Sequence, residues 1–274
     1  MHDGDVFIHP SASVHDTVQL DTGVKIGPFS VIREGVTIGK NTRIDANVYI
    51  EGNTVIGEGN SFSPYSSIGT APQDVSYNGE ETRLIIGSRN VFREFITINR
   101  GSAKDAGITS IQDDNYMMAY SHVGHDCQIG SHTIFTNGAT LGGHVTIQDF
   151  VYLSALTGIH QFCRIGKFAL VGGGSIVTQD ILPFCRVAGS RPMRYYGVNA
   201  IGLRRSGYTR ERINRVKDIF KIFFHSDLNT TQAVERIKED CPTDEDRELM
   251  LDFITASKRG IVKKAGEKWE THEE

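Results

Sequence analysis

The sequence lacks the marks of several protein classes. No run of about 18 apolar residues occurs in its 274 residues, so we expect no transmembrane helix. The stretch from Met1 to Asp5 has no basic segment leading into an apolar one, so we expect no signal peptide. The 4 cysteines are scattered without a C-x-x-C pair, which argues against a zinc ribbon or a disulfide framework. We therefore expect a reduced, cytoplasmic protein.

Proline is also scarce, at 7 residues, and charge of one sign is not in large excess. The net charge of -4 argues against a general nucleic-acid binder. Basic residues are nevertheless concentrated in one segment, because seven arginines and a single acidic residue, Glu211, lie between Arg191 and Arg215. This segment is either the solvated start of a helical region or a platform for an anionic group or an acidic partner.

Glycine, in contrast, is abundant at 29 residues, and it takes part in a repeat. An aliphatic or aromatic residue returns at every sixth position through residues 8–68, 86–98 and 111–177. Glycine often follows this residue, as in Ile26-Gly27 and Ile129-Gly130, and small or β-branched residues favour the fifth position. A helical period of 3.6 residues would spread the apolar residues around the helix, so the repeat is not helical.

A short strand followed by a sharp turn, repeated many times, explains both the apolar period and the glycines. This pattern is typical of the hexapeptide form of the parallel β-helix. Three hexads close one triangular coil, each coil rises by about 4.8 Å, and about nine coils are expected. The resemblance to hexapeptide-repeat proteins implies left-handed coiling. The predicted fold is therefore an all-β left-handed parallel β-helix followed by a small α-helical C-terminal domain.

Two stretches, residues 70–85 and 101–110, break the register and are expected to leave the prism as loops. After Val177 the pattern turns helical, with expected helix starts near Thr209, Thr230 and Thr243. The predicted domains are the β-helix at 1–190 and the helical region at 191–274, in which residues 265–274 are expected to form a frayed tail.

Five of the 10 histidines lie within one short part of the repeat: His122, His125, His132, His144 and His160. The 18-residue coil stacks the hexads that begin at 123, 141 and 159, and this brings four of these histidines to one patch. Their third positions, His125, Gly143 and Gln161, should lie about one strand spacing apart. The phase places His132 on the next face and outside the patch.

Three interpretations of this patch compete. Solvated histidines could be incidental, or imidazoles could converge on a metal ion. The carbonic anhydrases of this scaffold use two histidines five residues apart, which this chain does not have, so no metal is expected. General-base catalysis by a neutral imidazole is the third and favoured interpretation. Asp126 follows His125, and a glycine at 143 leaves a backbone amide free to face a ligand.

At this point the chain resembles a known family, the acyl-carrier-protein-dependent UDP-N-acetylglucosamine 3-O-acyltransferases of bacterial lipid A synthesis. The resemblance covers about residues 6–262. Its specific marks are Pro72-Gln73-Asp74, Asn99-Arg100-Gly101, His122-Val123-Gly124-His125-Asp126-Cys127, Leu141-Gly142-Gly143-His144-Val145, His160-Gln161-Phe162-Cys163, Gly197-Val198-Asn199 and Gly202-Leu203-Arg204-Arg205.

The resemblance implies direct transfer of an (R)-3-hydroxyacyl chain from acyl-carrier protein to the glucosamine 3-hydroxyl, the first step of lipid A synthesis. It implies that His125 is the base, that Asp126 supports it, and that the Gly143 amide stabilises the oxyanion. The residues that it assigns to the sugar nucleotide are Gln73, Asp74, His122, His144, His160, Gln161, Asn199 and Arg205.

The resemblance further implies a homotrimer with sites between adjacent prisms, no stable membrane insertion and no cofactor besides the phosphopantetheine of the donor. The acidic carrier protein would explain the arginine-rich segment, and Arg204, Arg210 and Arg212 are the expected docking residues.

The chain departs from the family pattern at three single positions, and its Arg204-Arg205 pair also sits one step early, before Ser206. Ser76 stands where the family usually has Lys, Asn99 where it has His, and Ile201 where it has Glu. These departures leave open a 3-amino sugar nucleotide as acceptor, which would make the product an amide. An acetyl-CoA-dependent acetyltransferase on the same prism is a further alternative. A structural or ice-binding β-helix fits poorly, because such proteins have flat threonine arrays and no extruded loops.

Overall fold

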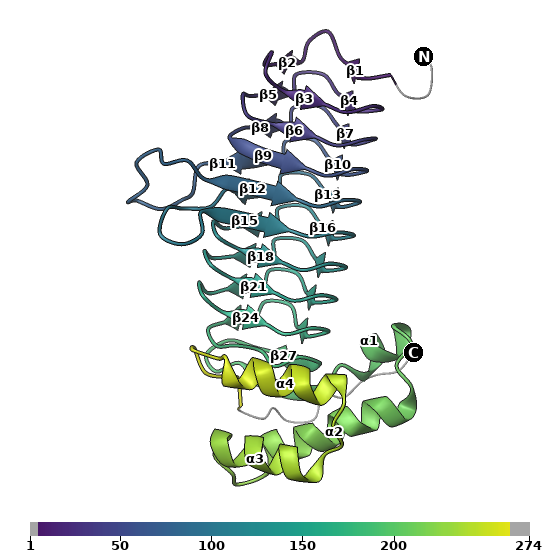
Figure 1. Cartoon of the computed structure of the whole chain (residues 1–274), viewed down its shortest axis with the longest axis vertical. Helices are drawn as coiled ribbons and strands as arrows, with labels where there is room; N and C mark the ends of the chain where they lie inside the picture. Colours follow the sequence, from purple (N-terminus) through teal and green to yellow (C-terminus); the bar gives the residue numbers. More distant parts are fainter. Residues whose placement is uncertain (1–4, 264–274) are drawn as a thin grey trace.

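The computed structural model describes residues 5–263. The expected tail at 265–274 and the first four residues lie outside this range. The described chain winds as a triangular prism whose three faces are stacks of short strands in parallel register, as the hexad repeat predicts (Figure 1). The fold class is the left-handed parallel β-helix with short helices at the C-terminal end, so this prediction is confirmed.

The chain passes from the first sheet to the second, then to the third, and back to the first. The first sheet contains β1 (Phe7–Ile8), β4 (Lys25–Ile26), β7 (Arg43–Ile44), β10 (Ser61–Phe62), β13 (Val91–Phe92), β16 (Tyr116–Met117), β19 (Ile134–Phe135), β22 (Tyr152–Leu153), β25 (Leu170–Val171), β27 (Cys185–Ala188) and β28 (Arg194–Val198).

The second sheet contains β2 (Ser13–Val14), β5 (Val31–Ile32), β8 (Tyr49–Ile50), β11 (Ser67–Thr70), β14 (Thr97–Asn99), β17 (His122–Val123), β20 (Thr140–Leu141), β23 (Gly158–Ile159) and β26 (Ile176–Val177). The third sheet contains β3 (Gln19–Leu20), β6 (Thr37–Ile38), β9 (Asn53–Ile56), β12 (Arg83–Ile86), β15 (Ile108–Ile111), β18 (Gln128–Ile129), β21 (Thr146–Ile147) and β24 (Arg164–Ile165).

The first residue of each hexad points into the prism and makes its core. From Ile26 to Val177 these residues are almost completely buried, whereas the residue before each of them faces outward. The fourth residue of many hexads has a positive φ near 60°, as at Asp126 and His144, which gives the sharp bend at each corner. We name the corners one (first to second sheet), two (second to third) and three (third to first).

Both interruptions of the repeat emerge at corner two. The first loop, residues 71–82, joins β11 to β12, and the second loop, residues 100–107, joins β14 to β15. Figure 1 shows the two loops projecting from the same side of the prism. β11, β14 and β17 are neighbours in the second sheet, so the loops lie one and two coils away from the His125 corner.

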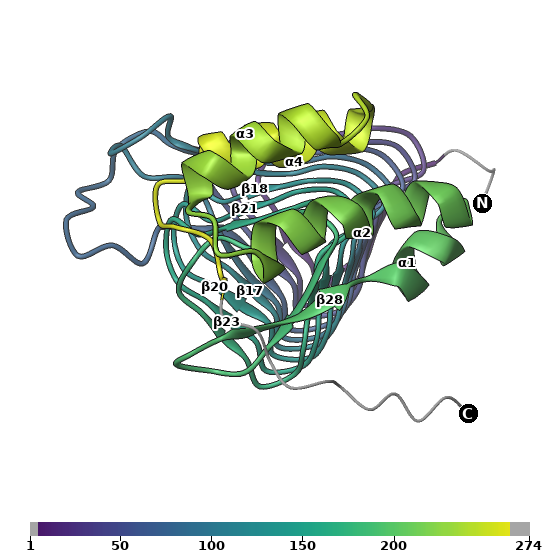
Figure 2. The ribbon, with the colours of Figure 1, turned by 90° about the horizontal axis from the view of Figure 1, so that it is seen from below.

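Helices close the C-terminal end of the prism, where they lie across its last coils (Figure 2). They are α1 (Ala200–Arg205), α2 (Arg210–His225), α3 (Thr230–Asp240) and α4 (Glu245–Thr255). Thr209 caps α2 and α3 begins at Thr230, both as expected, whereas α4 is capped by Asp244, one residue after the expected Thr243. The antiparallel pair of β27 and β28 and the short α1 were not expected.

No helix within residues 5–263 is both long and apolar enough to cross a membrane.

Candidate active site

The candidate site lies at corner two, in the middle of the prism. His125 and Asp126 occupy the turn between β17 and β18. His144 occupies the corresponding turn one coil later, between β20 and β21. Val123 pairs with Leu141 in parallel register, as an 18-residue coil requires. The repeat therefore sets this stack of side chains, and the two loops at the same corner stand beside it.

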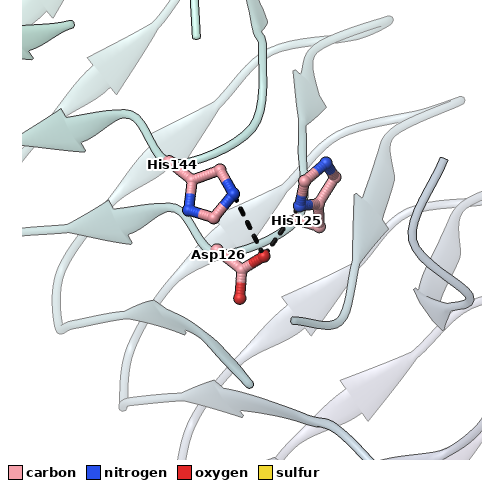
Figure 3. A group of neighbouring side chains, drawn as sticks. All are labelled: His125, Asp126 and His144. Atoms are coloured by element: carbon pink, nitrogen blue, oxygen red, sulfur yellow. Dashed lines mark hydrogen bonds and ion pairs between the residues drawn. The ribbon is translucent and has the colours of Figure 1, made fainter. Parts of the chain in front are cut away.

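His125 and Asp126 form a hydrogen-bonded dyad. The His125 Nδ1 lies 2.7 Å from Asp126 Oδ2, and the two side chains are 15% and 2% exposed (Figure 3). The Asp126 carboxylate also accepts hydrogen bonds from the amide and the hydroxyl of Ser102, at 3.0 and 2.7 Å. With Nδ1 engaged by the carboxylate, Nε2 is the ring nitrogen of His125 that could act as a base.

Gly143 lies directly over the ring of this base. A side chain built at Gly143 would place its Cβ 2.7 Å from His125 Nε2, so only glycine leaves the imidazole in its place. Within residues 5–263 the Gly143 amide has no hydrogen-bond acceptor. A free donor next to a free base is the pair that attack on a carbonyl group requires.

His144 and His122 frame the dyad. The His144 ring stands perpendicular to that of His125 at a centroid distance of 5.2 Å, its Nε2 lies 3.7 Å from Asp126 Oδ2, and its other face stacks on Phe162. The His122 Nδ1 lies 2.8 Å from the Thr97 hydroxyl. Burial, with a smaller contribution from His125, lowers the pKa of His122 below its usual value, which favours the neutral imidazole.

The remaining predicted sugar-nucleotide residues of this face are solvent-accessible. His160 and Gln161 are exposed in the coil after His144, and the His160 Nδ1 lies 3.2 Å from the Gln161 carbonyl oxygen. Gln73 and Asp74 belong to the first loop, where Gln73 is exposed and Asp74 is half-buried. These residues offer accessible polar groups in the coil after His144 and in the first loop.

The side chains of His125, Asp126 and His144 also lie close enough together to resemble a metal site. Ligand atoms of His125, Asp126 and His144 all lie within 4.8 Å of one another. The Asp126 carboxylate, however, already accepts hydrogen bonds from Ser102 and His125, and a cation at this place would have to displace them.

The neighbouring thiols are unsuited to a covalent acyl intermediate. Cys127 follows Asp126 in the chain, but its side chain is buried in the prism and its sulfur donates to the Gly142 carbonyl oxygen. Burial raises the pKa of Cys127 to about 12 and that of Cys163 to about 11. Neither thiol would be ionised near neutral pH, and the thiolate is the nucleophilic form.

Two predicted site residues, Asn199 and Arg205, lie elsewhere on the chain. They line a cavity at corner three of about 690 Å³ together with His132, Phe150 and Phe168. Figure 2 shows the loops of corner two on one side of the prism and α1, which contains Arg205, on another. One chain therefore does not bring Asn199 and Arg205 to His125.

The predicted docking arginines divide into two groups. Arg204 and Arg210 line a second cavity of about 530 Å³, together with Lys217, and none of the three has an ion-pair partner in the described chain. Arg212, in contrast, binds Asp246 through two nitrogens, at 2.6 and 2.9 Å, and stacks over Tyr208. This bidentate contact joins α2 to α4.

Comparison with known proteins bears on this geometry. Residues 180–262 match the model of domain 2 of the UDP N-acetylglucosamine O-acyltransferases, and residues 35–70 and 108–143 match the bacterial transferase hexapeptide. A curated acyl-[acyl-carrier-protein]–UDP-N-acetylglucosamine O-acyltransferase from Syntrophobacter fumaroxidans is 44% identical over 256 residues, which cover 93% of this chain and 99% of that protein. This chain belongs to that acyltransferase family.

Other relatives and solved structures agree with this membership. The acyltransferase of the same name from Thermodesulfovibrio yellowstonii is 43% identical, with 93% of this chain and 99% of that protein covered. The solved UDP-N-acetylglucosamine acyltransferase of Francisella novicida has a TM-score of 0.90 at 38% identity and 94% coverage of each chain. That of Bacteroides fragilis has a TM-score of 0.89 at 37% identity, with 93% of this chain and all of that chain covered.

The candidate site also contains residues that the sequence analysis did not name. Ser102, Lys104 and Asp105 belong to the second loop and contact Asp126, Asp74 and His144 respectively. The break in the repeat predicts where the loop leaves the prism, but it does not predict which side chains the loop contacts. The one available signal was the adjacent Lys-Asp pair, placed one coil before the histidine patch.

Proposed function

We propose that this acyltransferase moves an (R)-3-hydroxyacyl chain from acyl-carrier protein to the 3-hydroxyl of UDP-N-acetylglucosamine by direct attack. His125 Nε2 takes the hydroxyl proton as the oxygen attacks the thioester carbonyl carbon. The Gly143 amide donates to the oxyanion of the tetrahedral intermediate. The intermediate then expels the thiolate of the phosphopantetheine arm, and the His125 imidazolium returns the proton to it. No bond to the enzyme forms.

One observation carries this proposal above the others. His125 has its Nδ1 bonded to a buried carboxylate while its Nε2 faces the glycine whose amide is free. Base and oxyanion donor therefore converge on the place where one reacting group can lie between them. In this proposal Gln73, Asp74, His122, His144, His160 and Gln161 hold the sugar nucleotide around that place.

We infer that three copies of the chain complete the site. Corner one exposes a column of apolar side chains, Phe29, Tyr65, Phe95, Tyr120 and Leu156. Tyr65, Phe95 and Tyr120 stack at 5.2 and 4.9 Å. An exposed apolar column of this length marks a contact with another protein surface.

Three parallel prisms would bury this apolar column if corner one of each copy lay on a common threefold axis. The second sheet of each copy then faces the first sheet of its neighbour, and corner two meets the neighbour's corner three. The corner-three cavity holds His132 and Phe150, which lie in the coils of His125 and His144, so the heights match. Asn199 and Arg205 of one copy would thus reach the nucleotide bound beside His125 of the next.

Replacing His132 tests the assignment of His132 and His144 to different corners. The His132→Ala variant should keep kcat within about twofold of the wild type, because His132 does not contact the reacting groups. Any change should be confined to the KM of the acceptor, whose nucleotide would lie near the corner-three cavity. His144→Ala, measured in parallel, should lower kcat. An equal loss of kcat in both variants would contradict the assignment of the two corners.

The carrier protein docks, in this proposal, on the cavity of Arg204, Arg210 and Lys217. Charge on the rim of an interface mainly speeds encounter with an oppositely charged partner. The predicted contribution of Arg212 stays open to test, although its guanidinium already binds Asp246.

Reversing the charge at Arg210 tests the docking. Arg210→Glu should raise the KM of the carrier-bound donor and leave the KM of the UDP-sugar unchanged. The effect should shrink with added salt, because the Debye length falls to about 8 Å at 0.15 M. Arg33→Glu, near the opposite end of the prism, is the matched control. Unchanged donor kinetics in Arg210→Glu at low salt would mean that this cavity does not receive the carrier.

The proposed reaction is tested by its product. The protein is incubated with (R)-3-hydroxyacyl acyl-carrier protein and UDP-N-acetylglucosamine, or with the 3-amino sugar nucleotide or acetyl-CoA as alternatives, and the products are weighed. We expect an acyl ester that hydroxylamine cleaves. A hydroxylamine-resistant amide formed in preference would support the 3-amino acceptor instead. Transfer from acetyl-CoA alone would overturn the choice of donor.

The reaction is placed in the cytoplasm in this proposal. All four cysteines are free and buried in the structure, as suits a reducing compartment.

A further inference from the structure

The second loop contacts three separate groups of the site through three closely spaced residues, Ser102, Lys104 and Asp105. Ser102 donates to Asp126 from both its amide and its hydroxyl. Lys104 Nζ lies 2.7 Å from Asp74 Oδ2 in the first loop. Asp105 Oδ2 lies 3.5 Å from His144 Nδ1. This segment therefore links the first loop to the catalytic dyad.

Asp74 is held on both of its oxygens. Its own loop supplies the amide and the hydroxyl of Ser76, which donate to Oδ1 at 3.0 and 2.9 Å. The other oxygen receives Lys104, and the Asp74 side chain is only 11% exposed. Lys104, followed by Ser76, holds the pKa of Asp74 well below its usual range, so this carboxylate stays ionised.

The ion pair of Lys104 with Asp74 also restrains the outer part of the first loop. Val75, next to Asp74, is fully exposed, so packing does not fix this part of the loop. The loop is anchored at Tyr77, whose hydroxyl accepts from Arg100 at 3.0 Å. Without Lys104 the Asp74 carboxylate would keep only contacts within its own loop, and its distance from the dyad would no longer be fixed.

We propose that Lys104 is an acceptor-positioning residue, which ties the position of Asp74 to the second loop so that Asp74 can bind a hydroxyl of the sugar. The inference rests on the proposed function and adds a residue and a role to it. The ammonium group of Lys104 donates to Asp74, so its effect on the sugar passes through that carboxylate. Lys104 acts on acceptor binding, because no contact joins it to His125.

The test is steady-state kinetics of Lys104→Met with both substrates varied. We expect the KM of UDP-N-acetylglucosamine to rise about threefold to tenfold, with kcat within about twofold and the donor KM unchanged, since a partly exposed ion pair is the interaction that is lost. Lys104→Arg, which keeps the positive charge, should have an acceptor KM close to that of the wild type. Lys221→Met is the matched control, because it removes another exposed lysine paired with an aspartate, Asp218, at 2.8 Å on α2.

A second substitution tests whether Asp74 needs a cation as such or needs the second loop that carries Lys104. Because the Ser76 amide donates to the same carboxylate, Ser76→Lys in the Lys104→Met background supplies a cation to Asp74 from within the first loop. Recovery of the acceptor KM supports the role of the cation at Asp74. A wild-type KM in Lys104→Met, or an equal loss in Lys221→Met, would overturn the inference. Absence of ester product with the wild type would instead overturn the proposed function.

Discussion

His125→Ala should lower kcat by about 10²-fold to 10⁴-fold, the usual contribution of a general base. The reason is the geometry at corner two, where Nδ1 is bonded to Asp126 and Nε2 lies beside Gly143, whose amide is free in the described chain. The side chain is 15% exposed and lies outside the prism core, so the variant should keep its fold and its assembly.

Circular dichroism and gel filtration of His125→Ala establish that the fold is intact before its rate is interpreted. The measurement is the initial rate of ester formation at saturating concentrations of both substrates. A folded variant that retains more than about half of the wild-type rate would show that His125 is not the base.

Gly143→Ala should be almost as damaging, by about 10²-fold in kcat, although it adds only one methyl group. Its new Cβ would lie 2.6 and 2.7 Å from His125 Cε1 and Nε2, so the imidazole must move away from the reacting oxygen. A displacement of about 1 Å at a reacting group is enough for a loss of this size. The φ of Gly143 is not positive, so alanine strains no backbone there.

The two substitutions should not be additive. If Gly143→Ala acts by displacing the base, it should cost almost nothing further in the His125→Ala background, because the displaced ring is already absent. Equal losses in both backgrounds would show that Gly143→Ala damages the site by another route, such as the backbone amide.

The sequence was sufficient for the prism and for part of the site because both follow from one period. Eighteen residues per coil place Val123 beside Leu141, and the structure has this pair in register. The same period stacks His125 under Gly143 at corner two. Alternation along a strand would turn the side chains of His125 and Asp126 to opposite faces. Asp126 has a positive φ at the corner, and its carboxylate lies 2.7 Å from His125 Nδ1.

Contacts made outside the repeat could not be predicted in this way. The path of residues 100–107 depends on hydrogen bonds such as Ser102 to Asp126, which no periodicity encodes. The pairing of β27 with β28 and the turn of α1 follow the last hexad and depend on packing against the end of the prism. The bidentate contact of Arg212 with Asp246 joins two helices whose relative placement the sequence left open.

The most direct test of a site shared between chains is subunit complementation. His125→Ala and Arg205→Ala chains are exchanged into mixed trimers and assayed at acceptor concentrations below the KM. In a random assembly from equal amounts of the two chains, a site built from the base of one chain and the arginine of its neighbour is intact at about a quarter of all interfaces. We predict that exchange raises the rate above that of the same two proteins mixed without exchange. A rate that stays equal or falls on exchange would contradict the account.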